Sequence, residues 1–141
     1  MELVDVSKCL GEEQLSEVFA LSVGYPTPEK LAGLAARYSS ESSWSAFALF
    51  EGASPVGVIG IELRSPGSAR IRHISVAPRA QRLGIGRRLI EGIRTRNALR
   101  ELYAETDAGA VAFYRRCGFV VTSLGELHPG VERFACWWRA A

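Results

Sequence analysis

Six residues near the middle of the chain have the types and the spacing of a phosphate-binding turn. The segment Gln81–Gly86 stands between a strand-like run, Ile71–Val76, and a helical run that begins at Arg87. A short glycine turn that leads directly into a helix leaves backbone N–H groups unpaired and places the positive end of the helix dipole beside them. Glycine also lets the backbone approach a ligand without an intervening Cβ atom. The turn therefore predicts a phosphorylated ligand.

Positive charge gathers around this turn. Residues 70–100 hold nine arginines and one acidic residue, Glu91, a net charge of +8. Because the whole chain carries +2, the remainder carries −6. We expect Arg82, Arg87 and Arg88, which flank the turn, to face the phosphate. Nucleic acid is not the expected partner, because the basic block lacks the interleaved aromatic residues that stack on bases.

Two common phosphate-binding motifs do not fit the turn. A dinucleotide fingerprint needs Gly or Ala three residues after its second glycine, and Leu89 occupies that position. A P-loop ends in Gly-Lys followed by Ser or Thr, but Gly86 is followed by Arg87-Arg88. Nucleoside triphosphate chemistry is therefore not expected.

A length of 141 residues predicts a single domain over residues 1–141, and the apolar periodicity and the turn residues predict an α/β (α+β) fold. A central strand meander, followed by alternating helices and strands, implies a mixed, mostly antiparallel sheet of six to seven strands flanked by about four helices. The expected strands are 2–6, 44–50, 56–63, 69–76, 101–106, 119–124 and 131–138, and the expected helices are 12–23, 28–38, 87–99 and 110–117.

Composition indicates a reduced, cytoplasmic protein without metal. The three cysteines are odd in number and widely spaced, which indicates neither a disulfide framework nor a zinc site. No apolar stretch approaches the roughly 20 residues that span a bilayer. The first residues, Met1–Asp5, lack the basic and then apolar pattern of a secretory signal.

Two motifs in register resemble those of the GNAT superfamily of N-acetyltransferases. Gln81–Arg87 resembles the family's coenzyme A pyrophosphate signature, Gln/Arg-x-x-Gly-x-Gly/Ala. Ala112–Phe119 resembles its second hallmark, in which a tyrosine shortly precedes Gly-Phe. Together the motifs cover about residues 69–120, and the element order matches the family over most of the chain. The resemblance implies a GNAT-like fold whose sheet is splayed at the acyl-CoA site, with acetyl-CoA as cosubstrate and no metal.

The resemblance also implies where the cofactor would bind. The strand that ends at Val76 would splay from its neighbour and pair with the pantetheine arm like an added strand. Backbone amides of Arg82 to Arg87 would hold the pyrophosphate, and Asp107 stands where the family often has an asparagine that contacts pantetheine. The cofactor-binding residues implied in this way are Ile74, Ser75, Val76, Gln81, Arg82, Leu83, Gly84, Ile85, Gly86, Arg87, Asp107 and Tyr114.

Tyr114 would lie beside the thioester sulfur and act as the general acid. A tyrosine, with a pKa of about 10, stays protonated at neutral pH and can donate to a departing thiolate. Some family members use a glutamate as base at the position of Arg70, and an arginine cannot accept a proton. Glu105 is the replacement we favour, because its strand ends next to the reaction centre in this fold. His73 and a chain of ordered water are the alternatives, and His128, in the turn before the last strand, is a candidate for contact with the acceptor.

The function implied is transfer of an acetyl or other acyl group from acetyl-CoA to a primary amine of a small molecule, peptide or protein, by direct attack on the thioester. Cys117 is expected to be a buried small side chain and not an acyl carrier. Because Arg70 stands at the position of a catalytic glutamate, a non-catalytic acyl-CoA sensor with the same fold is the alternative function. Residues 1–43 carry a net charge of −4, which slightly favours a cationic acceptor. The last strand, 131–138, could pair with a second copy of the chain, so a homodimer is left open.

Overall fold

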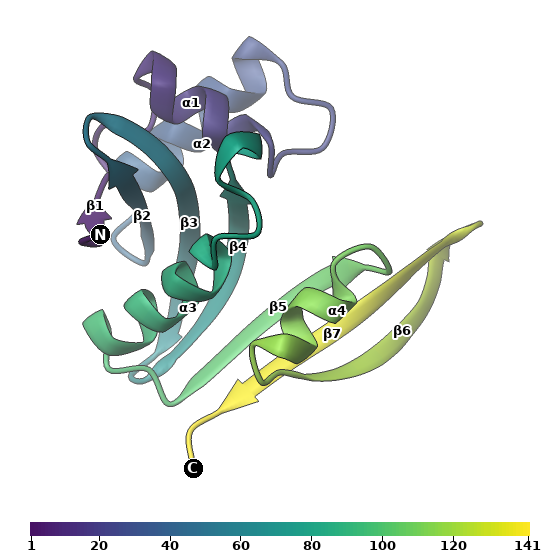
Figure 1. Ribbon diagram of the computed structural model, residues 1–141. Helices are drawn as coiled ribbons and strands as arrows, with labels where there is room; N and C mark the ends of the chain where they lie inside the picture. The colour runs from purple at the N-terminus through teal and green to yellow at the C-terminus, as the bar shows by residue number, and fades with distance from the viewer.

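The computed structural model describes residues 1–141. Seven strands form an open sheet that is split in the middle, and four α-helices pack against it (Figure 1). The predicted mixed sheet and its flanking helices are confirmed. In chain order the elements are β1 (Val4–Asp5), α1 (Glu13–Ala20), α2 (Pro28–Ser40), β2 (Trp44–Glu51), β3 (Ser54–Ser65), β4 (Ser68–Val76), a 3₁₀ turn η1 (Pro78–Ala80), α3 (Ile85–Arg96), β5 (Glu101–Asp107), α4 (Val111–Arg116), β6 (Val120–His128) and β7 (Val131–Arg139).

The sheet has the strand order β1-β2-β3-β4-β5-β7-β6. All neighbouring strands are antiparallel except β4 and β5, which are parallel. The β4–β5 ladder contains three residue pairs, from Ser68–Glu101 to Arg70–Tyr103. Beyond Arg70 the two strands diverge, as Figure 1 shows, and this divergence divides the sheet into an N-terminal half and a C-terminal half.

A β-bulge in β4 lies just past the point of divergence. Gly60 of β3 pairs with His73 and Ile61 pairs with Ile71, so Arg72 is the extra residue. A bulge bends its strand and increases the local twist. It also resets the alternation of side chains along β4, and His73 then points toward α1 and α2.

Helices cover both faces of the N-terminal half but only one face of the C-terminal half. A core of 11 buried residues lies between the sheet and α1 and α2. A larger core of 19 buried residues lies on the opposite face under α3 and α4, and it includes Leu102 and Cys136 of the C-terminal half. The other face of the C-terminal half carries Tyr103 and Trp137, whose ring centroids are 4.4 Å apart.

Several predicted element ends shift for local reasons. The helix expected to reach residue 99 ends at Arg96, because the Asn97 side chain donates to the Ile93 carbonyl and Ala98 has a φ of +48°. The helix expected over 12–23 ends at Ala20, where tight turn bonds follow. Strand β6 runs on to His128, which pairs with Val131 across the hairpin turn.

The three cysteines are free, and Cys117 is buried as expected. No three His, Cys, Asp or Glu side chains come together in a geometry that could hold a metal ion. None of the helices combines the length and apolar character needed to cross a membrane.

Candidate active site

The divergence of β4 from β5 opens into a cavity of about 840 Å³. A volume of this size lies within the range of natural ligand pockets. The wall brings together most of the predicted cofactor contacts, namely Ile74, Ser75, Val76, Gln81, Arg82, Gly84, Ile85, Gly86, Arg87 and Tyr114. Glu105 lines the same cavity. Residues from three separate parts of the chain therefore meet at one site.

Two predicted cofactor contacts do not line this cavity. The side chain of Leu83 is 63% exposed and stands outside the wall. The carboxylate of Asp107 accepts the Gly109 N–H at 2.9 Å and so closes the turn before α4. A turn of this kind is a common role for aspartate. Contact between Asp107 and a pantetheine arm stays a prediction.

The turn before α3 presents unpaired amides to the cavity. The first bond of the helix runs from Arg88 N–H to the Gly84 carbonyl at 3.0 Å, and Gly84 offers no capping side chain. The N–H groups of Ile85, Gly86 and Arg87 consequently have no helical acceptor. Gly84 has a φ of +75°, and a Cβ atom there would meet nothing within 4 Å. The backbone at Gly84 is thus open to a ligand, and the helix terminus suits an anion.

Gly86 has a different role from Gly84. A Cβ atom at Gly86 would lie 2.8 Å from the ring of Phe113, far inside van der Waals contact. Its missing side chain lets α3 approach α4 closely. Phe113 in turn packs against Tyr114, with ring centroids 5.2 Å apart. Gly86 therefore sets the spacing between the amide turn and the tyrosine.

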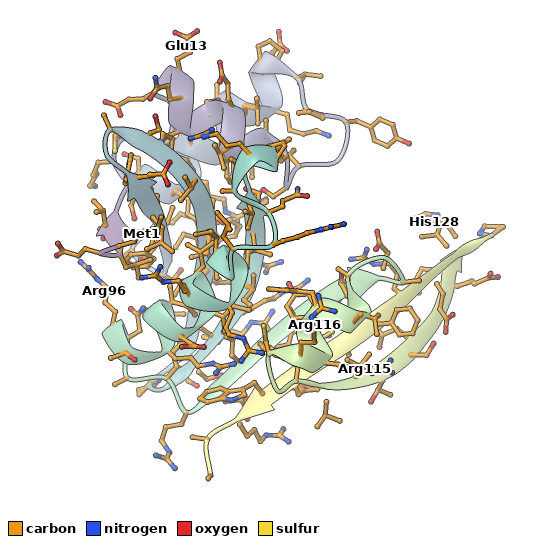
Figure 2. All side chains as sticks on the ribbon, viewed as in Figure 1. Met1, Glu13, Arg96, Arg115, Arg116 and His128 are labelled. Carbon is orange, nitrogen blue, oxygen red and sulfur yellow. The ribbon has the colours of Figure 1, made fainter.

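Three arginines line the cavity on the side of α3 and α4. They are Arg82, Arg87 and Arg116. The Arg87 guanidinium donates to the Arg116 carbonyl, which joins the start of α3 to the end of α4. Arg116 is labelled on α4 in Figure 2. Arg82 has a φ of +68°, a conformation that residues with side chains rarely adopt and that clusters at functional sites. Arg88, which we expected at the phosphate, is exposed and does not line the cavity.

The second half of β4 exposes a strand edge to the cavity. Because the β4–β5 ladder ends at Arg70, the backbone of Ile74 to Val76 has no strand partner on that side. The Ser75 hydroxyl does not compete for these groups, since it donates to the Val18 carbonyl of α1 at 2.7 Å. This open edge can accept an extended ligand as an added strand.

Tyr114 projects from α4 between two aromatic rings. Its ring centroid lies 5.2 Å from that of Phe113 and 5.1 Å from that of Phe119, both in edge-on geometry. The residue is buried, yet its hydroxyl has no hydrogen-bond partner in the protein and is not sealed from solvent. Burial raises the pKa of Tyr114 above its ordinary value, so the phenol holds its proton firmly.

Glu105 lies two residues beyond the last β4–β5 pair, where the strands have separated. One carboxylate oxygen, Oε2, accepts the Tyr103 hydroxyl at 2.7 Å and lies 3.7 Å from Nη2 of Arg70. The second oxygen, Oε1, has no partner in the protein. Burial and the hydrogen bond to Glu105 raise the pKa of Tyr103 to about 12. Arg70 thus stands beside Glu105 and holds it in place.

The structure weakens His73 as a base and places His128 away from the cavity. His73 lines the cavity, and its Nδ1 lies 2.6 Å from the hydroxyl of Tyr38. Burial, and secondarily Arg72, lowers the pKa of His73 to about 4, which makes it a poor proton acceptor. His128 lies near the tip of the β6–β7 hairpin, far from the α3–α4 contact in Figure 2. It does not line the cavity.

Sequence reasoning missed several residues of the wall, among them Phe113, Arg72 and Arg133. Phe113 lies next to a predicted residue, so its aromatic character was a usable signal. Arg72 enters through the bulge in β4, and Arg133 enters because β7 lies between β5 and β6. Neither of these two features has a local signature in the sequence. None of the seven acidic residues among positions 1–43 lines the cavity. The net negative charge of that segment is therefore no guide to the charge of the acceptor.

Comparisons with known proteins agree with this geometry. The family model described as "Acetyltransferase (GNAT) domain" matches residues 12–132. A comparison with curated protein sequences finds no match.

Solved structures share the fold at low sequence identity. An aminoglycoside 6'-N-acetyltransferase complexed with coenzyme A aligns with a TM-score of 0.83 at 14% identity, over 99% of this chain and 97% of that one. An acetyltransferase from Thermus thermophilus aligns with a TM-score of 0.77 at 23% identity, over 99% and 98% of the two chains. A GNAT family acetyltransferase from Elizabethkingia anophelis with acetyl-CoA bound aligns with a TM-score of 0.70 at 14% identity, over 98% and 97%.

The family match spans the amide turn, the open β4 edge and Tyr114, which are the features that the cavity joins. The likeness to solved structures extends over nearly the whole chain and supports the same fold. The chain belongs to the GNAT acetyltransferase family.

Proposed function

We propose that the protein transfers an acetyl group from acetyl-CoA to a primary amine. The observation that carries the proposal is that a phosphate-type amide turn, a free strand edge and a buried tyrosine with an unpaired hydroxyl line one cavity. Two of the solved structures with this fold have coenzyme A or acetyl-CoA bound. These features support acetyl-CoA as the cosubstrate.

The residues present fit such a ligand along its length. The open amides after Gly84, with Arg82, Arg87 and Arg116 around them, suit a pyrophosphate. The free edge at Ile74–Val76 suits the amide-bearing pantetheine arm. Acetyl-CoA would supply the activated acetyl group, and the protein would supply position and proton transfer.

The two faces of the divided sheet suit the two halves of the reaction. Tyr114 approaches from the α4 side, while Glu105 shares the opposite face with Tyr103. The new bond joins the amine nitrogen to the acetyl carbon, and the carbon–sulfur bond breaks. Tyr114 gives its proton to the departing sulfur. Glu105, through its free oxygen or a bound water, takes the proton that the amine loses, and solvent restores both groups.

The test combines binding and turnover on the purified protein. Calorimetry with coenzyme A and with acetyl-CoA measures the cofactor site, and release of free thiol with a panel of amines measures transfer. We expect saturable binding and steady thiol release that requires an amine, with the acetylated product identified by mass.

The outcomes separate transfer from sensing. Saturable binding without thiol release across amines, amino acids and peptide N-termini would replace the transferase with an acyl-CoA sensor. Absence of any complex with coenzyme A would remove both functions.

A further inference from the structure

The face of the C-terminal half-sheet that lacks a helix carries a matched pair of opposite charges. Glu105 pairs with Ala135 across the β5–β7 ladder, and Asp107 pairs with Arg133. Glu105 and Arg133 are therefore diagonal neighbours on one face, at a spacing of about 7–8 Å. Both line the cavity. No ion pair joins them to each other.

Each of these two residues keeps an unused charged group. Arg133 is half-buried, and its side chain makes no ion pair or hydrogen bond in the protein. Glu105 uses only Oε2, toward Tyr103 and Arg70, and its Oε1 is free. Arg72, the neighbouring arginine on β4, is held by Glu62 through bonds of 2.6 and 3.0 Å. Arg133 is thus the uncommitted cation on this face.

His73 adds a hydrogen-bond donor from the other side of the cavity. The Tyr38 hydroxyl is buried, and its one hydrogen-bond partner is Nδ1 of His73. A buried hydroxyl needs an acceptor, so Tyr38 donates and Nδ1 accepts. A neutral imidazole that accepts at Nδ1 carries its hydrogen at Nε2. In this tautomer the ring nitrogen of His73 that is left for a ligand is a donor and not a basic lone pair, and the residue lines the cavity.

The carboxylate of Glu105 consequently lies between donors on β4 and β7. Asp107, the other carboxylate at this end of β5, stands opposite Arg133 and accepts the Gly109 N–H at 2.9 Å, without an ion pair to Arg133. A cationic polyamine would bring like charge against Arg133, and a neutral amine would leave that guanidinium without a partner. A small zwitterion matches the arrangement, since its ammonium can meet Glu105 and its carboxylate can meet Arg133 and the donor at His73.

We propose that the acceptor is a small aminocarboxylate, of the class of a free amino acid, with its amine directed to Glu105 and its carboxylate bound by Arg133. This inference rests on the proposed acetyl transfer and names its substrate class. It predicts discrimination by the carboxylate and not by the overall size of the amine.

The experiment compares matched acceptors. The twenty amino acids, their carboxamides and the corresponding decarboxylated amines are supplied with acetyl-CoA, and kcat/KM is measured from thiol release. We expect at least one amino acid to exceed both its carboxamide and its decarboxylated amine by about tenfold or more, the size of one charge-assisted pair. Equal use of all three forms would overturn the inference.

Variants at Arg133 locate the effect. Arg133→Ala should lower kcat/KM for the amino acid about tenfold while leaving the carboxamide within about twofold, and Arg133→Lys should restore part of the loss. Arg139→Ala is the matched control, because Arg139 lies on the same strand, pairs with Glu101 and does not line the cavity. Equal losses for both acceptors in Arg133→Ala would overturn the assignment.

A binding measurement distinguishes failure of this inference from failure of the proposed function. Thiol release with neutral or cationic amines alone would keep the transferase and reject the aminocarboxylate. If no amine supports thiol release, the transferase fails, and calorimetric titration of the twenty amino acids into the coenzyme A complex still decides the site. Binding that Arg133→Ala abolishes would support the site, and absence of binding would overturn it.

Discussion

Replacement of Tyr114 by phenylalanine should slow acetyl transfer without lowering the stability of the protein. The change removes one hydroxyl that makes no hydrogen bond in the protein, and it leaves both ring contacts, to Phe113 and Phe119, in place. The free energy of unfolding should therefore change by less than about 1 kcal/mol. General acid catalysis contributes roughly 10²–10⁴-fold. Because burial raises the pKa of Tyr114 and makes it a weak acid, we expect a fall in kcat of about 100-fold, near the lower end.

The assay measures thiol release at saturating acetyl-CoA, with calorimetry of coenzyme A in parallel. A 100-fold fall corresponds to about 2.7 kcal/mol in the activation free energy, and cofactor affinity should stay within about threefold. Tyr25→Phe is the matched control, since Tyr25 is 93% exposed and does not line the cavity. A kcat for Tyr114→Phe within about twofold of the native value would refute the role of Tyr114, and a large loss of stability would refute the packing argument.

The remaining predictions concern the amide turn and the buried histidine. Gly84→Asp should abolish coenzyme A binding in calorimetry, because it places a negative charge and a strained φ at the open amides. Gly86→Ala should instead lower the free energy of unfolding by about 1–3 kcal/mol in denaturant titration, since its Cβ would press on Phe113. Retained affinity in Gly84→Asp, or unchanged stability in Gly86→Ala, would contradict these roles. The pKa of His73, lowered from 6.5 to about 4, means that the unfolded chain binds more protons between these values. Stability should be level above about pH 6.5 and fall by about 3 kcal/mol toward pH 4, and a pH profile with the same slope in His73→Asn would show that another group is responsible.

Features with local causes could be predicted from the sequence. The amide turn depends on glycine spacing and on the helix that follows, and Gly84, Ile85 and Gly86 line the cavity while Leu83 does not. Tyr114 was singled out because its spacing to Gly118-Phe119 resembles the family motif, and it lines the cavity. The hairpin of β2 and β3 and the cap of α2 at Thr27 likewise follow from turn and cap chemistry.

Features that depend on tertiary pairing could not be predicted in the same way. Arg133 reaches the cavity because β7 lies beside β5, an order that no residue of the last strand reveals. The bulge at Arg72 decides which side of β4 His73 faces, and its cause lies in the pairing with β3. The sequence shows that Arg70 replaces the glutamate of other family members, but it does not reveal that Arg70 lies against Glu105, the residue proposed as the base instead.

The three-pair joint between β4 and β5 has a mechanical consequence. So short a ladder could not by itself couple two half-sheets, yet the larger core runs beneath the joint and includes Leu89 and Ile90 on one side with Leu102 and Phe119 on the other. Side-chain packing, and not backbone pairing, therefore ties the halves together. We expect residues 1–100 and 101–141 to unfold on heating in a single cooperative transition, although β4 and β5 diverge over most of their length.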